Sequence, residues 1–191
     1  MSTLKQKQEL LNKIYEPYIC HTHCPLGLTE EHNVIFGSGN INTKLMIIGE
    51  APGKTEEEQG LPFVGRSGKL FTQILKSFSI DRDDIFITNI VKCRPQNNRT
   101  PSKKEVAAYK NLLLKQIDII QPKVICTLGA TAAQALLPEI PPITKSHGTL
   151  YWYNKIAIIP TYHPAYILRN SKNLPFFTQD LKKSIDLAFH L

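Results

Sequence analysis

Apolar residues fall along the chain in two kinds of pattern. Short continuous apolar runs, flanked by glycine, proline and polar residues, are typical of strands that are buried on both faces of a sheet. Between these runs, apolar residues recur three and four positions apart, which is the spacing of amphipathic helices. The runs predict strands at residues 44–48, 85–91, 123–128 and 156–159, and the periodic segments predict helices at 3–16, 68–78, 100–121, 129–137 and 176–189.

The regular alternation of strands and helices predicts an α/β fold. We expect a three-layer α/β/α sandwich with a central four-stranded, mostly parallel sheet, and a hairpin partner near Tyr151. A chain of 191 residues, 42% of them apolar, can bury one core, so one domain over residues 1–191 is expected. Ligands bind at the carboxyl ends of parallel strands. The loops at 49–66, 88–99 and 160–169 should therefore converge on one site.

The charge balance narrows the range of partners. Lys and Arg total 23 against 16 Asp and Glu, a net charge of +7 that favours a polyanion such as nucleic acid. The first residues lack the apolar segment of a signal peptide, and no apolar run approaches the ~20 residues that span a bilayer. We therefore expect a soluble cytoplasmic monomer without a membrane partner. In that reducing compartment, spaced cysteines indicate metal binding or catalysis more often than disulfides.

One motif resembles a phosphate-binding loop but departs from it. Residues 49–55 (Gly-Glu-Ala-Pro-Gly-Lys-Thr) follow a predicted strand, yet three residues separate the two glycines where a P-loop has four. The acidic residues 56–58 come next and would repel a triphosphate. A nucleotide hydrolase is therefore disfavoured.

Three segments together carry a resemblance to a known family. Residues 49–68 contain Gly-Glu-Ala-Pro-Gly and Gly-Leu-Pro-Phe-Val-Gly-Arg-Ser-Gly, residues 88–101 contain Thr-Asn-Ile-Val-Lys-Cys-Arg-Pro, and residues 160–169 contain Tyr-His-Pro-Ala-Tyr. In order and spacing they resemble the family 4 (iron–sulfur) uracil-DNA glycosylases, over about residues 20–187. The resemblance implies hydrolysis of the N-glycosidic bond of flipped-out deoxyuridine in single- or double-stranded DNA. The products are free uracil and an abasic site, and the reaction begins base-excision repair.

The chemistry of uracil suggests roles for several residues. The side-chain amide of Asn89 offers an acceptor and a donor that complement N3–H and O4 of uracil. Phe63 lies in a Gly/Pro-rich loop, where an aromatic ring suits stacking on a flat base. His163 is placed to donate a hydrogen bond to O2 as negative charge develops on the leaving base. The resemblance implies the same roles for Phe63 and His163, and it adds Glu50 and Ala51 to the uracil-binding set.

The position expected to act on water departs from the superfamily pattern. Other branches of the superfamily place Asp or Asn third in the Gly-x-x-Pro motif, but here the third residue is Ala51, which cannot act as a base. A nearby carboxylate can instead stabilise the cationic sugar, as in glycoside hydrolysis. We expect Glu50 to take this role, with Glu56 as the second choice, so that the catalytic set is Glu50, His163 and Glu56.

The third segment is also expected to contact the duplex. Ile167 and Leu168 are candidate wedges for the space that the flipped base leaves. Basic residues on the same predicted edge are expected to hold phosphates. These are Lys92, Arg94, Arg99, Arg169 and Lys172.

The cysteines match the family only in part. The family holds a [4Fe–4S] cluster through four Cys. Cys20, Cys24 and Cys93 match three of these positions, although three residues rather than two separate the first pair, and the fourth position falls near Tyr109. Cys126 lies within a predicted strand and is expected in the core.

Three alternatives remain for this site. A cluster recruits His21 or His23 as its fourth ligand, the Cys/His set binds Zn²⁺, or no metal is bound. The family's cluster looks structural, so the chemistry is not expected to require it. The altered cysteines and Ala51 also leave a second function open, a module that binds uracil-containing or abasic DNA with weak or no catalysis.

Overall fold

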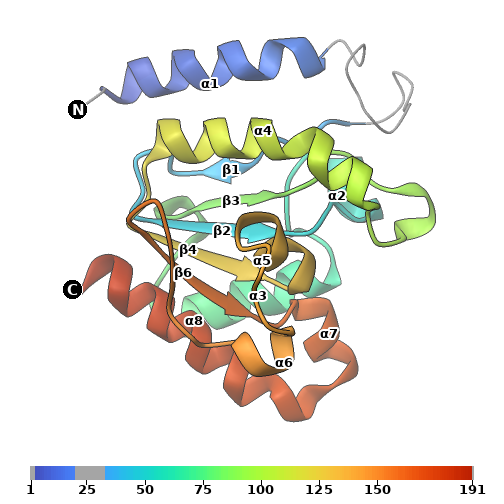
Figure 1. The fold of residues 1–191 in the computed structure, drawn as a ribbon, viewed down its shortest axis with the longest axis vertical. Helices are drawn as coiled ribbons and strands as arrows, with labels where there is room; N and C mark the ends of the chain where they lie inside the picture. Colours follow the sequence, from blue (N-terminus) through green and yellow to red (C-terminus); the bar gives the residue numbers. More distant parts are fainter. Residues whose placement is uncertain (1–2, 20–32, 191) are drawn as a thin grey trace.

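A six-stranded sheet forms the centre of the protein in a computed structural model that describes residues 3–19 and 33–190 (Figure 1). Its strand order is β1-β3-β2-β4-β6-β5. The four inner strands are parallel to one another, and each edge strand is antiparallel to its neighbour. The inner strands are β3 (Phe86–Asn89), β2 (Leu45–Gly49), β4 (Val124–Leu128) and β6 (Ile156–Thr161), and the edge strands are β1 (Ser38–Gly39) and β5 (Tyr151–Tyr153).

The four predicted strands are confirmed as the parallel core, but the expected strand count of four is wrong for the whole sheet. β5 is the hairpin partner expected near Tyr151. β1 was not predicted, because two residues of sequence Ser-Gly carry no apolar pattern. It pairs with β3 and covers that edge of the parallel core.

Helices cover both faces of the sheet, which confirms the α/β/α sandwich (Figure 1). On one face lie α4 (Lys103–Ile120) and α5 (Ala130–Leu136), with α1 (Leu4–Ile19) outside α4. On the other face lie α3 (Arg66–Ser77), α7 (Pro164–Arg169) and α8 (Leu174–Phe189). Among the described residues, no helix is both long and apolar enough to cross a membrane.

The strands are apolar throughout because each faces two cores. In β2, Leu45 and Ile47 pack toward α3 and α8, whereas Met46 and Ile48 pack toward α4 and α5. Successive side chains of a strand point to opposite faces, so burial on both sides requires a continuous apolar run.

Several boundaries differ from the predictions. The loop at 49–66 contains a short helix, α2 (Lys54–Gln59), and the loop at 160–169 contains α7. The helix predicted at 100–121 is α4, and it begins after Ser102 rather than after Thr100, because Ser102 and Glu105 form a reciprocal capping box. The remaining short elements are η1 (Arg82–Asp84), η2 (Gln96–Asn98), α6 (Ile143–Ser146) and η3 (Ser171–Asn173).

Candidate active site

A cleft of about 620 Å³ opens at the carboxyl ends of the parallel strands. Its walls come from the segments after β2, β3 and β6, so the predicted convergence of three loops is confirmed. The residues that follow β4 form a fourth wall, which was not predicted. The sequence-predicted residues at the cleft are Glu50, Ala51, Glu56, Phe63, Asn89, Arg99, His163 and Arg169.

Asn89 ends β3 and is fixed by the sheet, where it is in register with Gly49. The residue is only 1% exposed, and its Oδ1 atom is buried with no hydrogen-bond partner among the described residues. A buried acceptor without a partner costs about 1–3 kcal/mol, so such atoms are rare unless a ligand satisfies them. Asn89 therefore presents an unmet acceptor at the cleft wall, as a base-reading amide requires.

Phe63 packs beside Asn89 in an unusual backbone conformation. Its φ of 52° lies in the left-handed region, which a bulky residue seldom adopts. The ring lies 5.7 Å from that of Phe71 and 5.8 Å from that of His163, measured between centroids. Gly49 makes this packing possible, because a methyl group there would collide with both the Phe63 ring and Asn89 Oδ1. The strained backbone thus holds an aromatic ring against the cleft.

Arg82 supports the Phe63 backbone from behind, a role that was not predicted. Its Nη1 donates to the Phe63 carbonyl at 2.9 Å, and its Nη2 donates to the Pro62 carbonyl at 2.5 Å. Gly68 of α3 completes the support, since any side chain there would collide with the Phe63 backbone. Nothing local in the sequence near Arg82 indicates this contact, because 19 residues separate the donor from the Phe63 acceptor.

His163 is the N-cap of α7, and this sets which ring nitrogen can donate. Its Nδ1 accepts a hydrogen bond from the Ala165 backbone N at 3.1 Å. Burial lowers the pKa of His163 to about 4, with Arg169 acting in the same direction and Glu56 opposing. The imidazole is therefore neutral at pH 7, and with Nδ1 accepting, its proton lies on Nε2. Nε2–H is the donor left for a ligand.

Glu50 follows β2 and lines the cleft. Thr131, just after β4, donates a hydrogen bond from Oγ1 to Glu50 Oε2 at 2.5 Å. This contact fixes a carboxylate on the cleft wall. Thr131 was not predicted, because the pattern at residues 129–137 indicates only a helix.

Glu56 has a different part in the structure. Its Oε1 accepts from the backbone N atoms of Val64 and Gly65 at 3.0 and 2.7 Å. The carboxylate thus ties α2 to the loop that carries Phe63 and to the start of α3. Glu56 lines the cleft, but these bonds indicate that it holds the loop in place rather than acting on substrate.

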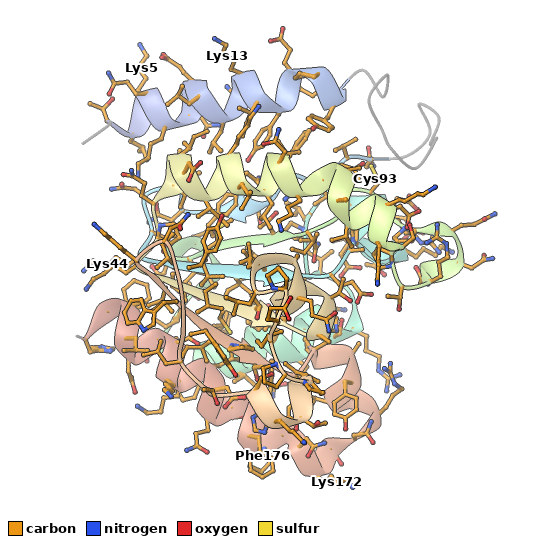
Figure 2. The ribbon with its side chains drawn as sticks, viewed as in Figure 1. Lys5, Lys13, Lys44, Cys93, Lys172 and Phe176 are labelled. Atoms are coloured by element: carbon orange, nitrogen blue, oxygen red, sulfur yellow. The ribbon has the colours of Figure 1, made fainter. Side chains whose placement is uncertain are left out.

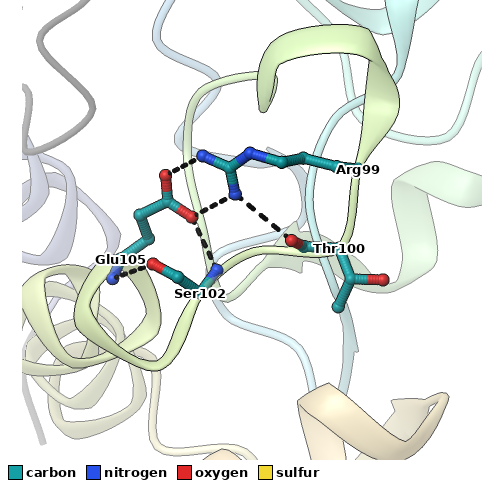
Figure 3. Close-up of polar contacts among 4 residues, drawn as sticks. All are labelled: Arg99, Thr100, Ser102 and Glu105. Carbon is teal, nitrogen blue, oxygen red and sulfur yellow. Dashed lines mark hydrogen bonds and ion pairs between the residues drawn. The ribbon is translucent and has the colours of Figure 1, made fainter.

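The expected phosphate ligands differ in availability. Arg99 lines the cleft, but both its terminal nitrogens bind the carboxylate of Glu105, which also accepts from Ser102 N (Figure 3). The same bonds lower the pKa of Glu105 to about 2. Arg94 pairs with Glu57 at 3.0 Å. These two arginines are therefore largely neutralised within the protein.

Lys92 was expected on the surface, and this is wrong. Its side chain is fully buried, its Nζ donates to three protein oxygens, and burial lowers its pKa well below the ordinary value. In contrast, Arg169 lies exposed at the rim of the cleft and takes part in no ion pair found among the described residues. Lys172 is exposed at the start of the η3–α8 segment (Figure 2).

The two candidate wedge residues differ in exposure. Ile167 is 2% exposed and packs in the core with α3 and α8, so its expected insertion into a duplex is wrong for this conformation. Leu168 is 39% exposed at the end of α7 and remains a candidate. Helical geometry explains the difference, because neighbouring positions of α7 point to different sides.

The cysteine site is only partly described. Cys20 and Cys24 lie outside the described residues, as do His21 and His23. Cys93 is buried beside α4, and its Sγ is 3.0 Å from the phenol oxygen of Tyr109 (Figure 2).

One thiol and one phenol therefore stand where the resemblance implies two thiolates. The described residues contain no group of three or more His, Cys, Asp and Glu side chains suited to a metal ion. In this part of the chain, the residues do not fit a four-thiolate [4Fe–4S] site.

Cys126 is buried in β4, as expected. Burial raises the pKa of its thiol to about 12, which leaves it protonated and unsuited to metal binding. It belongs to the core between the sheet and α8.

Comparisons with known proteins show the family of this chain. The sequence profile of the Uracil DNA glycosylase superfamily matches residues 36–185. A type-4 uracil-DNA glycosylase of Thermotoga maritima is 45% identical over 169 residues, covering 87% of this chain and 88% of its own. Type-4 enzymes of Sulfurisphaera tokodaii and Archaeoglobus fulgidus are 42% and 37% identical, covering 93% and 94% of this chain and 84% and 94% of their own. The chain therefore belongs to the uracil-DNA glycosylase superfamily, and within it to the type-4 uracil-DNA glycosylases.

Proposed function

We propose that this protein hydrolyses the N-glycosidic bond of deoxyuridine in DNA, releasing uracil and leaving an abasic site. The observation that carries the proposal is the unpaired, buried Oδ1 of Asn89 at a cleft shared with Phe63 and His163. Three different groups thus surround one space, each suited to a different feature of uracil. The relatives named above are uracil-DNA glycosylases, which supports the same activity here.

Recognition rests on one amide and one ring. Asn89 Oδ1 accepts from uracil N3–H, and Nδ2 donates to O4, while the base stacks on Phe63. Cytosine presents an acceptor at N3 and a donor at its exocyclic amine, so it meets like groups on Asn89. Such mismatches leave buried polar groups unpaired and discriminate by ~10⁴ or more.

Bond cleavage places opposite charges on the two fragments. The C1′–N1 bond breaks, its electron pair leaves with N1, and the negative charge spreads onto O2, where neutral His163 donates from Nε2. Glu50, held by Thr131, stabilises the cationic sugar from the cleft wall. A water oxygen then bonds to C1′ and loses a proton, and uracil takes up a proton.

The remaining predicted groups act outside the reaction. Glu56 holds the Phe63 loop, and Leu168 with Arg169 is assigned to the DNA surface. Cys93 does not line the cleft, so we place it and its neighbours in the framework that supports the loop after β3.

Incubation with a uracil-containing oligonucleotide, followed by alkali, tests the proposal. We expect strand cleavage at the uracil position. We expect none in a matched, thymine-free oligonucleotide that has cytosine in place of uracil. Intact strands after incubation with folded protein would refute the enzyme activity. Tight, salt-sensitive binding without cleavage would instead support a binding module.

A further inference from the structure

Lys92 is a buried amine directly behind the wall of the cleft. It lies three residues after Asn89, and its side chain is 0% exposed. Its Nζ donates to Thr88 Oγ1 at 2.7 Å, to the Asn89 carbonyl at 2.7 Å and to Gln116 Oε1 at 2.6 Å. Three acceptors match the three N–H groups of a lysine ammonium, so its hydrogen-bonding capacity is fully used.

The partners of Lys92 connect the end of β3 to two helices. Gln116 of α4 donates through Nε2 to Tyr15 Oη at 2.6 Å and to the Phe36 carbonyl at 2.7 Å. Thr88 Oγ1 also donates to the Phe36 carbonyl, at 2.7 Å. The network therefore ties the Asn89 peptide to α4, to α1 and to the segment before β1. A buried network in which every bond is satisfied rigidifies the groups it contains.

This anchoring matters because the Asn89 side chain has little else to fix its acceptor. Oδ1 has no hydrogen-bond partner among the described residues, so its position depends on the backbone that carries it. Recognition groups must be held to within roughly 0.5 Å to act on a ligand. Of the two side-chain donors to the Asn89 carbonyl in the described structure, Lys92 Nζ makes the shorter bond, 2.7 Å against 3.5 Å for Thr88 Oγ1.

We propose that Lys92 is a positioning residue for base recognition, which holds the Asn89 peptide so that the side-chain amide meets the edge of uracil. The inference rests on the proposed function and deepens it, because it names a specificity determinant that never touches the substrate. Lys92 acts through geometry, and its effect should appear in uracil binding and in discrimination rather than in contact with DNA.

The test compares Lys92→Met with Lys44→Met. Methionine keeps the length and apolar stem of lysine and removes the three donors. Lys44 is exposed just before β2, away from the cleft, and serves as the matched control (Figure 2). The readouts are the single-turnover rate of uracil release, the inhibition constant of free uracil, the dissociation constant for uracil-free DNA, and the melting temperature.

For Lys92→Met we expect the inhibition constant of free uracil to rise about tenfold or more, and the release rate to fall by a similar factor, because a displaced Asn89 amide weakens its hydrogen bonds to uracil, and the loss of one such bond changes an equilibrium by roughly that amount. Affinity for uracil-free DNA should stay within about threefold of the wild type, as surface contacts are untouched. Lys44→Met should match the wild type in every readout.

If Lys92→Met does not fold, Thr88→Val is the second variant. It removes one acceptor of Lys92 Nζ together with the hydroxyl's own bonds to the Phe36 and Asn89 carbonyls, and a smaller rise in the inhibition constant of free uracil is expected. Unchanged uracil inhibition in a folded variant, or equal losses for uracil and for uracil-free DNA, would overturn the positioning role. Failure of the wild type to release uracil would overturn the proposed function instead, so the two failures are distinct.

Discussion

At the scale of single residues, His163 is assigned to bond cleavage and not to DNA binding. Its Nδ1 is used by the Ala165 amide, so Nε2–H is the group that faces the leaving base. We expect His163→Ala to lower the single-turnover rate by about 10²–10³, the usual cost of losing a donor to a developing anion. Affinity for DNA, measured by fluorescence anisotropy on uracil-free oligonucleotide, should change little. Equal losses of rate and affinity would indicate a folding or docking defect and contradict the assigned role.

The protonation of His163 gives a second prediction. Burial lowers its pKa to about 4, so the folded protein keeps it neutral where an ordinary histidine, with a pKa of about 6.5, is already charging. The acid limb of kcat/KM should therefore lie near pH 4, and activity should persist through pH 5.5–6, which a pH–rate profile measures.

The same shift links His163 to stability. The unfolded chain binds this proton at about pH 6.5, and the folded chain binds it only near pH 4. The contribution of neutral His163 to the free energy of unfolding is therefore complete above pH 6.5 and is lost as the pH falls toward 4.

For the pH–rate profile, an acid limb of kcat/KM centred at 6.5 would contradict a buried, neutral donor.

At the scale of elements, the connection from α2 to α3 depends on one carboxylate. Glu56 Oε1 accepts from two backbone amides of the loop after Phe63. A glutamine oxygen can accept the same bonds, so we expect Glu56→Gln to keep the release rate within roughly threefold. Glu56→Ala should lower the free energy of unfolding by about 1–3 kcal/mol, because one buried and one partly buried donor lose their acceptor. It should also slow uracil release as the loop moves.

Chemical denaturation and single-turnover kinetics on both Glu56 variants decide this point. If Glu56→Gln is stable but as slow as Glu56→Ala, the charge of Glu56 takes part in the reaction. Holding the loop would then be an incomplete description of this residue.

The elements also show where a sequence can mislead. The buried strands could be predicted, because burial on both faces demands continuous apolar runs. α7 was missed, since Pro160, Pro164 and Asn170 all favour turns. In the structure Pro164 stands at the first helical position after His163, where its lack of an N–H costs nothing.

At the scale of the whole molecule, the count of 23 Lys and Arg residues overstates the number of basic side chains available to DNA. Lys92 is buried, and Arg94 and Arg99 are paired with carboxylates. We expect Arg169→Gln to weaken DNA binding and to reduce the slope of log affinity against log salt by about 1, as for one phosphate contact. Lys13→Gln on α1 removes the same charge far from the cleft and should leave the slope unchanged (Figure 2). Equal effects of the two variants would show that the charge acts diffusely.

The candidate site was predictable only in part, for a physical reason. The strand ends bring Asn89, Phe63 and His163 together, which strand order alone allows one to expect. The burial of Lys92 depends on Gln116, and the support of Phe63 depends on Arg82, partners 24 and 19 residues away. Such contacts arise from tertiary packing and leave no local pattern in the sequence.

The most direct test of the central claim is the release of free uracil from a uracil-containing oligonucleotide under single-turnover conditions, by the wild type and by Asn89→Asp. Asn111→Asp, on the exposed face of α4, controls for the added charge. The account predicts uracil release by the wild type and by Asn111→Asp. In Asn89→Asp, which loses the donor to O4, the release rate should fall by a factor of about 10² or more. No release by folded wild-type protein, or equal rates for Asn89→Asp and the wild type, would contradict it.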